Sequence, residues 1–189
     1  MLRCSSGNMS ARLENGLVAI SSTGSWVGEI EAEQVAVCKL EDGQCVNNLK
    51  PTVEINFHLG ILKKRADVNV VLHYQSPYAT AIACGKPEKH NYAVIIETPL
   101  YNLNEPEIVD YFAPGSKQLA DAVVNAFNNC DIAILKNHGL VTVGKNYNDV
   151  IRNACFFELA CQILCIEKNP TALTSEQAAA LGKAYQKKS

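Results

Sequence analysis

The clearest indication of the fold is a stretch in the second half of the chain, which reads Asp131-Ile132-Ala133-Ile134-Leu135-Lys136-Asn137-His138-Gly139-Leu140-Val141-Thr142-Val143-Gly144. Apolar and β-branched residues lie on both sides of a short Asn-His-Gly segment, a pattern that predicts two buried strands over 131–136 and 140–143. A connection this short joins antiparallel strands, because parallel strands need a long crossover. We therefore expect an antiparallel pair with His138 in the turn between its strands.

A second strand pair is indicated by the Asp42-Gly43 step, which is a strong hairpin signal between the apolar segment 34–40 and residues 44–47. Further short apolar segments predict strands over 16–21, 67–72 and 93–97. Tight connections in at least two strand pairs favour an antiparallel or mixed sheet over the parallel sheet of nucleotide-binding folds.

Helices are indicated by apolar residues at helical spacing and by capping residues. They are expected over 52–65, 76–84, 116–127, 146–166 and from Thr174 onward. We expect Thr52, Asn146 and Thr174 to act as caps, with Gln177 completing a capping box for the last helix. Because helices and strands alternate, the sequence predicts an α/β fold in which helices cover the faces of the sheet.

The composition is that of an ordinary folded protein. With 189 residues the chain has the usual length of one domain, and we expect a single domain over 1–189. An apolar share of 48% beside 19% charged residues excludes intrinsic disorder, which combines low hydrophobicity with high net charge. The 17 basic and 19 acidic side chains give a net charge of -2, so we expect no nucleic-acid partner.

Neither a membrane segment nor an export signal is expected. No apolar run approaches the roughly 20 residues that cross a bilayer, and the first residues lack an apolar signal core. The 8 cysteines include no Cys-x-x-Cys pair, which favours reduced core cysteines in a cytoplasmic protein. The two commonest nucleotide signatures, Gly-x-Gly-x-x-Gly and the phosphate loop, are also missing.

The four histidines are few enough to be weighed individually. His73 follows a buried apolar segment and His138 lies in a turn, and side chains at such strand ends can converge. With Glu54, in the first turn of its expected helix, they could supply the three protein ligands of a catalytic zinc site. Glu54 and His58 share a helix face, which fits either a metal site or an ordinary polar contact. From the residues alone, a metal site and structural roles both remain open.

Three short segments combine small residues with hydroxyl groups or backbone donors. They read Ser6-Gly7-Asn8-Met9-Ser10, Ser22-Thr23-Gly24 and Lys50-Pro51-Thr52. Each alone is typical of a turn, but together they are the materials of a phosphate-binding nest.

The order of these segments along the chain resembles the class II aldolase and adducin family. The resemblance covers about residues 4 to 166, and an ordered series of six short motifs is far more specific than any one of them. The series consists of Ser6-Gly7-Asn8-Met9-Ser10, Ser22-Thr23-Gly24, Pro51-Thr52-Val53-Glu54-Ile55-Asn56-Phe57-His58, Val71-Leu72-His73, Ala113-Pro114-Gly115-Ser116 and Asn137-His138-Gly139-Leu140.

The resemblance implies a three-layer α/β fold with a central, mostly antiparallel sheet, assembled as a homotetramer with active sites between subunits. It also implies a helix ahead of the Ser-Gly-Asn motif, which we expect this chain to lack. In the aldolases of the family a divalent metal, usually zinc, is held by a glutamate and three histidines. Glu54, His73 and His138 match three of these positions, and the fourth falls on Gln75. Because an amide oxygen is a weaker donor than imidazole, manganese or cobalt could replace zinc.

The activity implied by the resemblance is the cleavage of a ketose 1-phosphate, such as L-fuculose 1-phosphate, to dihydroxyacetone phosphate and a short aldehyde. Glu54 would be both a metal ligand and the acid/base, and Tyr92 would protonate the leaving aldehyde from a neighbouring subunit. The substrate phosphate would be bound by Gly7, Asn8, Thr23, Gly24 and Thr52.

Other activities on the same framework remain open. Ribulose 5-phosphate 4-epimerase and a sugar-phosphate dehydratase would use the same kind of site. A non-catalytic, adducin-like assembly module is the alternative from a different class, and it would bind no divalent ion.

Overall fold

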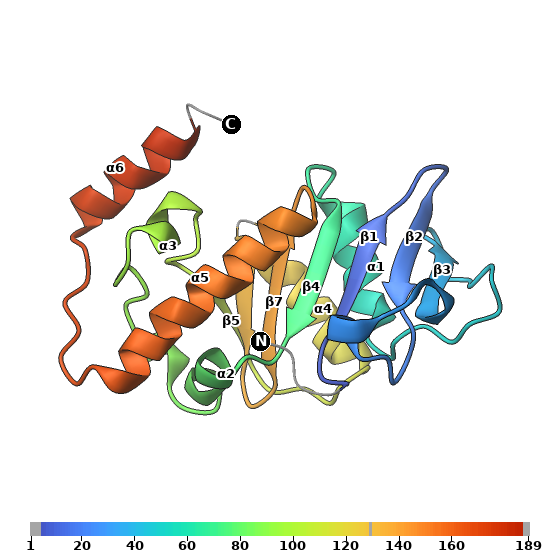
Figure 1. Cartoon of the computed structure of the whole chain (residues 1–189), viewed down its shortest axis with the longest axis horizontal. Coiled ribbons are helices and arrows are strands. Elements are labelled where there is room, and N and C mark those ends of the chain that lie inside the picture. The colour runs from blue at the N-terminus through green and yellow to red at the C-terminus, as the bar shows by residue number, and fades with distance from the viewer. Residues whose placement is uncertain (1–4, 129, 187–189) are drawn as a thin grey trace.

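In the part of the chain that the structure describes, the sheet has seven strands and is mixed, with one parallel pair. The structure is a computed structural model that describes residues 5–128 and 130–186. In space the strand order is β3-β2-β1-β4-β7-β6-β5 (Figure 1). Only the pairing of β5 with β6 is parallel, which confirms the mostly antiparallel sheet. The strands are β1 (Asn8–Arg12), β2 (Leu17–Ser21), β3 (Val35–Lys39), β4 (Val70–Tyr74), β5 (Glu107–Val109), β6 (Ile132–Leu135) and β7 (Gly139–Gly144).

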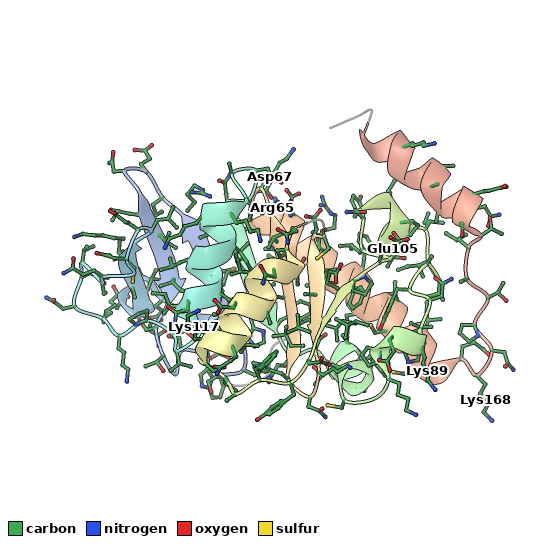
Figure 2. All side chains as sticks on the ribbon, turned by 180° about the vertical axis from the view of Figure 1, so that it is seen from behind. Arg65, Asp67, Lys89, Glu105, Lys117 and Lys168 are labelled. Carbon is green, nitrogen blue, oxygen red and sulfur yellow. The ribbon has the colours of Figure 1, made fainter. Side chains whose placement is uncertain are left out.

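Helices form a layer on each face of the sheet, as Figures 1 and 2 show from opposite sides. One layer consists of α1 (Ile55–Lys64) and α4 (Lys117–Ala126), which pack against each other. The other contains α2 (Pro77–Ala83) and the long α5 (Tyr147–Ile166). Outside α5 lie the short α3 (Glu97–Leu100) and α6 (Ser175–Gln186). The three-layer α/β fold implied by the resemblance is thus confirmed.

The alternation of side chains along β4 divides the core into two parts. Val70, Leu72 and Tyr74 belong to the cluster beneath α2 and α5, whereas Val71 belongs to the cluster beneath α1 and α4. Successive residues of a strand point to opposite faces, so His73 must lie on the same side as Val71. The strand therefore presents His73 to α1.

The caps expected for two helices are confirmed. Asn146 accepts a hydrogen bond from the backbone of Asp149 at the start of α5. Thr174 and Gln177 form a reciprocal capping box ahead of α6. The cap expected at Thr52 is wrong, because α1 begins only at Ile55. Its N-cap position is occupied by Glu54, whose carboxylate makes no capping bond and is free to point elsewhere.

Two expected strands are not formed as predicted. Residues 93–96 form turns, because the Thr98 hydroxyl donates to the carbonyl oxygens of Tyr92 and Ile95 and closes the chain locally. The strand expected over 44–47 is reduced to one isolated bridge, between Cys38 and Cys45. The short strands β1 and β5 were not predicted.

The expectation that all cysteines lie in the core is only partly right. Among the described residues, Cys38, Cys130 and Cys161 are buried and Cys45 is half-buried, but the side chains of Cys84, Cys155 and Cys165 are exposed. Cys4 lies outside the described residues. Within the described ranges, no helix is both long and apolar enough to span a bilayer.

Candidate metal and substrate site

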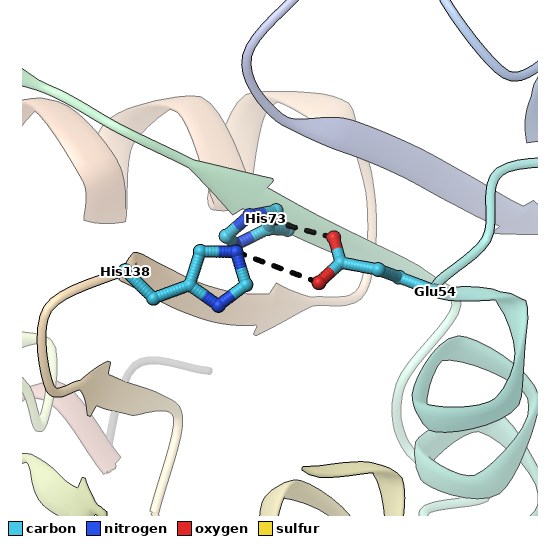
Figure 3. Close-up of side chains that lie close together, drawn as sticks. All are labelled: Glu54, His73 and His138. Carbon is cyan, nitrogen blue, oxygen red and sulfur yellow. Dashed lines mark ion pairs between the residues drawn. The ribbon is translucent and has the colours of Figure 1, made fainter. Parts of the chain in front are cut away.

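Three side chains from distant parts of the sequence meet at one end of the central strands (Figure 3). Glu54 precedes α1, His73 lies on β4, and His138 lies in the turn between β6 and β7. One carboxylate oxygen, Oε2, lies 3.5 Å from His73 Nε2, and the other, Oε1, lies 3.5 Å from His138 Nε2. One ligand atom from each residue lies within 4.8 Å of the others.

Strand register and one glycine bring the two imidazoles together. His73 pairs with Val141 of β7, so it lies beside the start of that strand. A β-carbon at Gly139 would lie 2.7 Å from the Tyr74 carbonyl oxygen, which is a collision, and 3.2 Å from the His73 ring, which is a tight contact. The turn itself needs a left-handed residue, which Asn137 supplies with a φ of 56°. The ring centres of His73 and His138 then lie 4.8 Å apart.

The hydrogen bonds decide which atoms point into the site. His73 Nδ1 lies 2.8 Å from the Leu140 carbonyl oxygen, which can only accept, so Nδ1 carries a proton; in the neutral ring, Nε2 then presents a lone pair to Glu54. Burial is the main cause that lowers the pKa of His138, which favours its neutral, ligating form. Glu54 is 5% exposed, and its Oε1 has no hydrogen-bond partner. Lone pairs that face one another in a buried place require a cation or a proton between them.

These donors fit a divalent ion. Two imidazoles and one carboxylate are the ligand set of many catalytic zinc sites, and a backbone carbonyl that orients the second ring nitrogen of a ligand is a usual supporting contact. The sequence prediction that Glu54, His73 and His138 form one cluster agrees with this geometry.

A cavity of about 230 Å³ opens next to the three ligands. Its lining includes Gln75 and all five residues expected to bind phosphate. These five are Gly7, Asn8, Thr23, Gly24 and Thr52. The backbone N–H groups of Thr23 and Thr52 already donate to the carbonyl oxygens of Lys50 and Ser21, so these residues offer their hydroxyl groups instead. Among the described residues that line this cavity there is no lysine or arginine.

Two expected site residues have contacts that the sequence did not reveal. The Asn8 side chain donates from Nδ2 to Glu54 Oε2 at 2.8 Å, so this amide nitrogen is bound to the carboxylate. The Gln75 side chain donates from Nε2 to the His138 carbonyl oxygen at 2.9 Å. The Oε1 atom of Gln75 is therefore the one that it could offer an ion.

Tyr92 lies away from this cavity. It is 3% exposed, its ring stacks on Phe157, and its hydroxyl donates to the Pro87 carbonyl oxygen at 2.9 Å. Burial raises the pKa of the phenol well above its usual value. The hydroxyl is thus bound within its own subunit, and the expected role of Tyr92 as an acid stays a prediction.

His58 and Ser10 belong to the surroundings of the site, although the sequence did not assign them there. His58 Nε2 lies 2.5 Å from Asn8 Oδ1, and His58 Nδ1 lies 2.8 Å from Ser10 Oγ. The spacing of Glu54 and His58 was the available signal, but the residue that joins them comes from β1. Burial, with a smaller contribution from His73, lowers the pKa of His58 to about 3, so its ring is neutral.

Comparison with known proteins shows which family this chain matches. The family described as Class II Aldolase and Adducin N-terminal domain matches residues 1–165. The chain belongs to the class II aldolase and adducin family. The resemblance read from the six motifs is thereby confirmed, and the aldolases of this family use a divalent metal.

The relatives within the family include two kinds of enzyme. A 3-oxo-tetronate 4-phosphate decarboxylase of Haemophilus influenzae is 32% identical over 78% of this chain and 70% of its own length. An L-fuculose phosphate aldolase of Methanococcus maripaludis is 33% identical over 87% of each chain. A solved structure of L-fuculose 1-phosphate aldolase, 23% identical, superposes with a TM-score of 0.87 over 97% of this chain and 87% of its own, which shows the same fold. The chain shares its family with aldolases and decarboxylases, which is consistent with lyase activity.

Proposed function

We propose that this protein is a metal-dependent carbon-carbon lyase that cleaves a ketose 1-phosphate, such as L-fuculose 1-phosphate, to dihydroxyacetone phosphate and a short aldehyde. The observation that carries the proposal is the convergence of one ligand atom each from Glu54, His73 and His138 beside a polar cavity. Zinc is the proposed ion, since imidazole and carboxylate suit it, with manganese or cobalt as the alternatives if Gln75 also takes part.

Each residue has a task in this proposal. A divalent ion held by Glu54, His73 and His138 would act as a Lewis acid that stabilises negative charge on the substrate oxygens. Glu54 Oε1, which accepts no hydrogen bond from the described residues, would take and return a proton. The hydroxyl groups of Thr23 and Thr52, with the backbone of Gly7 and Gly24, would bind the substrate phosphate.

Among the described residues that line the cavity there is no basic side chain, and this bears on the assembly. A phosphate dianion bound by neutral donors alone keeps its full charge, whereas most phosphate sites contain an arginine or a lysine. A second subunit could supply such a group, which supports the homotetramer with intersubunit sites expected from the resemblance. A single domain in the cytoplasm, without nucleic-acid or membrane partners, completes the proposal.

Decarboxylation is the second candidate, because some of the similar proteins carry that name. Loss of carbon dioxide from 3-oxo-tetronate 4-phosphate and cleavage between C3 and C4 of L-fuculose 1-phosphate both leave the enediolate of dihydroxyacetone phosphate. The same charge-stabilising site therefore serves both reactions. They differ in one proton, since only aldol cleavage requires a base to deprotonate the C4 hydroxyl group.

One experiment tests both candidates. The purified protein, with zinc, manganese or cobalt, is offered L-fuculose 1-phosphate, other ketose 1-phosphates and 3-oxo-tetronate 4-phosphate, and dihydroxyacetone phosphate is measured by coupled reduction. We expect its release from at least one ketose 1-phosphate and its loss when a chelator is added. Release from the keto acid alone would favour the decarboxylase. No release from any of them would contradict the proposed function.

A further inference from the structure

A row of buried polar side chains leads from the interior of the sheet to the Glu54 carboxylate. Ser10 Oγ contacts His58 Nδ1 at 2.8 Å, His58 Nε2 contacts Asn8 Oδ1 at 2.5 Å, and Asn8 Nδ2 donates to Glu54 Oε2 at 2.8 Å. All four side chains are buried, and His58 has no exposed surface. Polar groups this deep remain in a fold only when each finds a partner.

Only one arrangement of protons satisfies every contact in this row. An ionised carboxylate accepts and never donates, so Asn8 must turn its amide nitrogen toward Glu54 and its carbonyl oxygen toward the ring. His58 must then carry its proton on Nε2 and accept at Nδ1, where Ser10 donates its hydroxyl hydrogen. Every donor therefore points toward Glu54, because the carboxylate at the end of the row can only accept.

The row makes the two oxygens of Glu54 unequal. Oε2 accepts the amide hydrogen of Asn8, whereas Oε1 accepts no hydrogen bond from the described residues and lies 3.5 Å from His138 Nε2. The backbone cannot impose this orientation by itself, because Glu54 lies ahead of α1 and its carboxylate makes no capping bond. The Asn8 amide can impose this orientation, because the buried His58 ring holds its carbonyl oxygen in place.

We propose that His58 is a positioning residue for Glu54. It acts through Asn8 to hold the carboxylate in one orientation, with Oε2 bound to the amide and Oε1 left for an ion or a substrate proton. The part that concerns a substrate proton rests on the proposed function, whereas the part that concerns ion binding and ring tautomer does not.

The test compares two replacements of His58 with one control. His58→Phe keeps the aromatic contact with Phe57, whose ring lies 4.6 Å away, but removes the donor to Asn8. His58→Gln restores an N–H donor at similar reach. His90→Phe, at a half-buried histidine that does not line the cavity, is the control. For each protein, zinc affinity is measured by competition with a chelator, and turnover is measured on the best substrate.

We expect His58→Phe to lose about 10- to 100-fold in zinc affinity, the usual cost of removing a group that orients a metal ligand. Turnover should fall with it, His58→Gln should recover most of the loss, and His90→Phe should behave as the wild type. Unchanged zinc affinity in a folded His58→Phe protein would overturn the proposal, as would equal losses in the two His58 variants.

Nitrogen NMR of the wild-type imidazoles provides a measurement that needs no variant. We expect the His58 ring to be neutral, with a slowly exchanging proton on Nε2. A proton on Nδ1, or a charged ring near neutral pH, would contradict the row of donors. The wild type could show this tautomer, and the His58 variants the expected changes in zinc affinity, without any lyase activity. In that case the proposed function fails and the positioning role stands.

Discussion

The centre of the sheet and the segment 91–114 are built in different ways. In the centre, β1, β4 and β7 hold Asn8 and His73 by register, and buried hydrogen bonds then fix each polar atom. The segment 91–114 consists of turns, the four residues of α3 and the three of β5. Its one expected site residue, Tyr92, is turned into the core. In the centre, buried strands hold Asn8 and His73, and the segments that carry Glu54 and His138 lie directly beside these strands.

The largest effect is expected at the centre, from Glu54→Gln. Turnover should fall by about 100-fold or more, the usual scale for losing a general acid or base, while the fold survives because the amide has the same shape. Steady-state kinetics and a thermal melt measure the two effects. Glu88→Gln, at an exposed position, is the control. Near-normal turnover of Glu54→Gln would remove this carboxylate from the mechanism.

Low pH should destabilise the folded protein through the protonation of His58. Burial lowers the pKa of this ring from 6.5 to about 3, so the unfolded chain binds a proton in this range that the folded chain does not. The free energy of unfolding should therefore decrease as the pH falls from about 6.5 toward 3, by up to about 1.4 kcal/mol per pH unit from this group.

Denaturant unfolding of the metal-free protein between pH 4 and 7 would show the effect, and it should be smaller in His58→Gln, which has no ring to titrate. Parallel pH profiles for the two proteins would mean that His58 does not contribute.

Gln75 lies at the edge of the centre, and a smaller change is expected there. If its side chain faces the ion, Gln75→His should tighten zinc binding by about 10-fold, or about 1.4 kcal/mol, because imidazole is the better donor. Competition with a chelator measures the difference. Equal affinities would indicate that Gln75 serves only to hold the His138 carbonyl oxygen.

The smallest effect on turnover is expected in the other region, from Tyr92→Phe. The loss of the hydrogen bond to Pro87 should lower stability by about 1 kcal/mol, and turnover should stay within about 2-fold of the wild type. A thermal melt beside steady-state kinetics separates these outcomes. A loss of turnover above 10-fold with normal stability would return Tyr92 to the site and contradict the division between the two regions.

The same division explains what could be predicted from the sequence. The strands that carry the site have clear apolar patterns, and the six motifs identified Glu54, His73 and His138, which the structure then brings together. The Asn8 contact could not be predicted, because β1 is short and its polar residues read as a turn. The segment 93–97 looked like a strand because it is apolar, yet one threonine hydroxyl closes it into turns. Side-chain hydrogen bonds of this kind leave no periodic signal.

The central claim is that Glu54, His73 and His138 hold one divalent ion, and zinc stoichiometry tests it most directly. Metal-free protein is dialysed against excess zinc, passed over a desalting column and analysed for bound metal, beside His138→Ala and the control His90→Ala. We predict about one zinc per chain in the wild type and in His90→Ala, and little or none in His138→Ala, where too few ligands remain. Full zinc occupancy in a folded His138→Ala protein, or none in the wild type, would contradict the account.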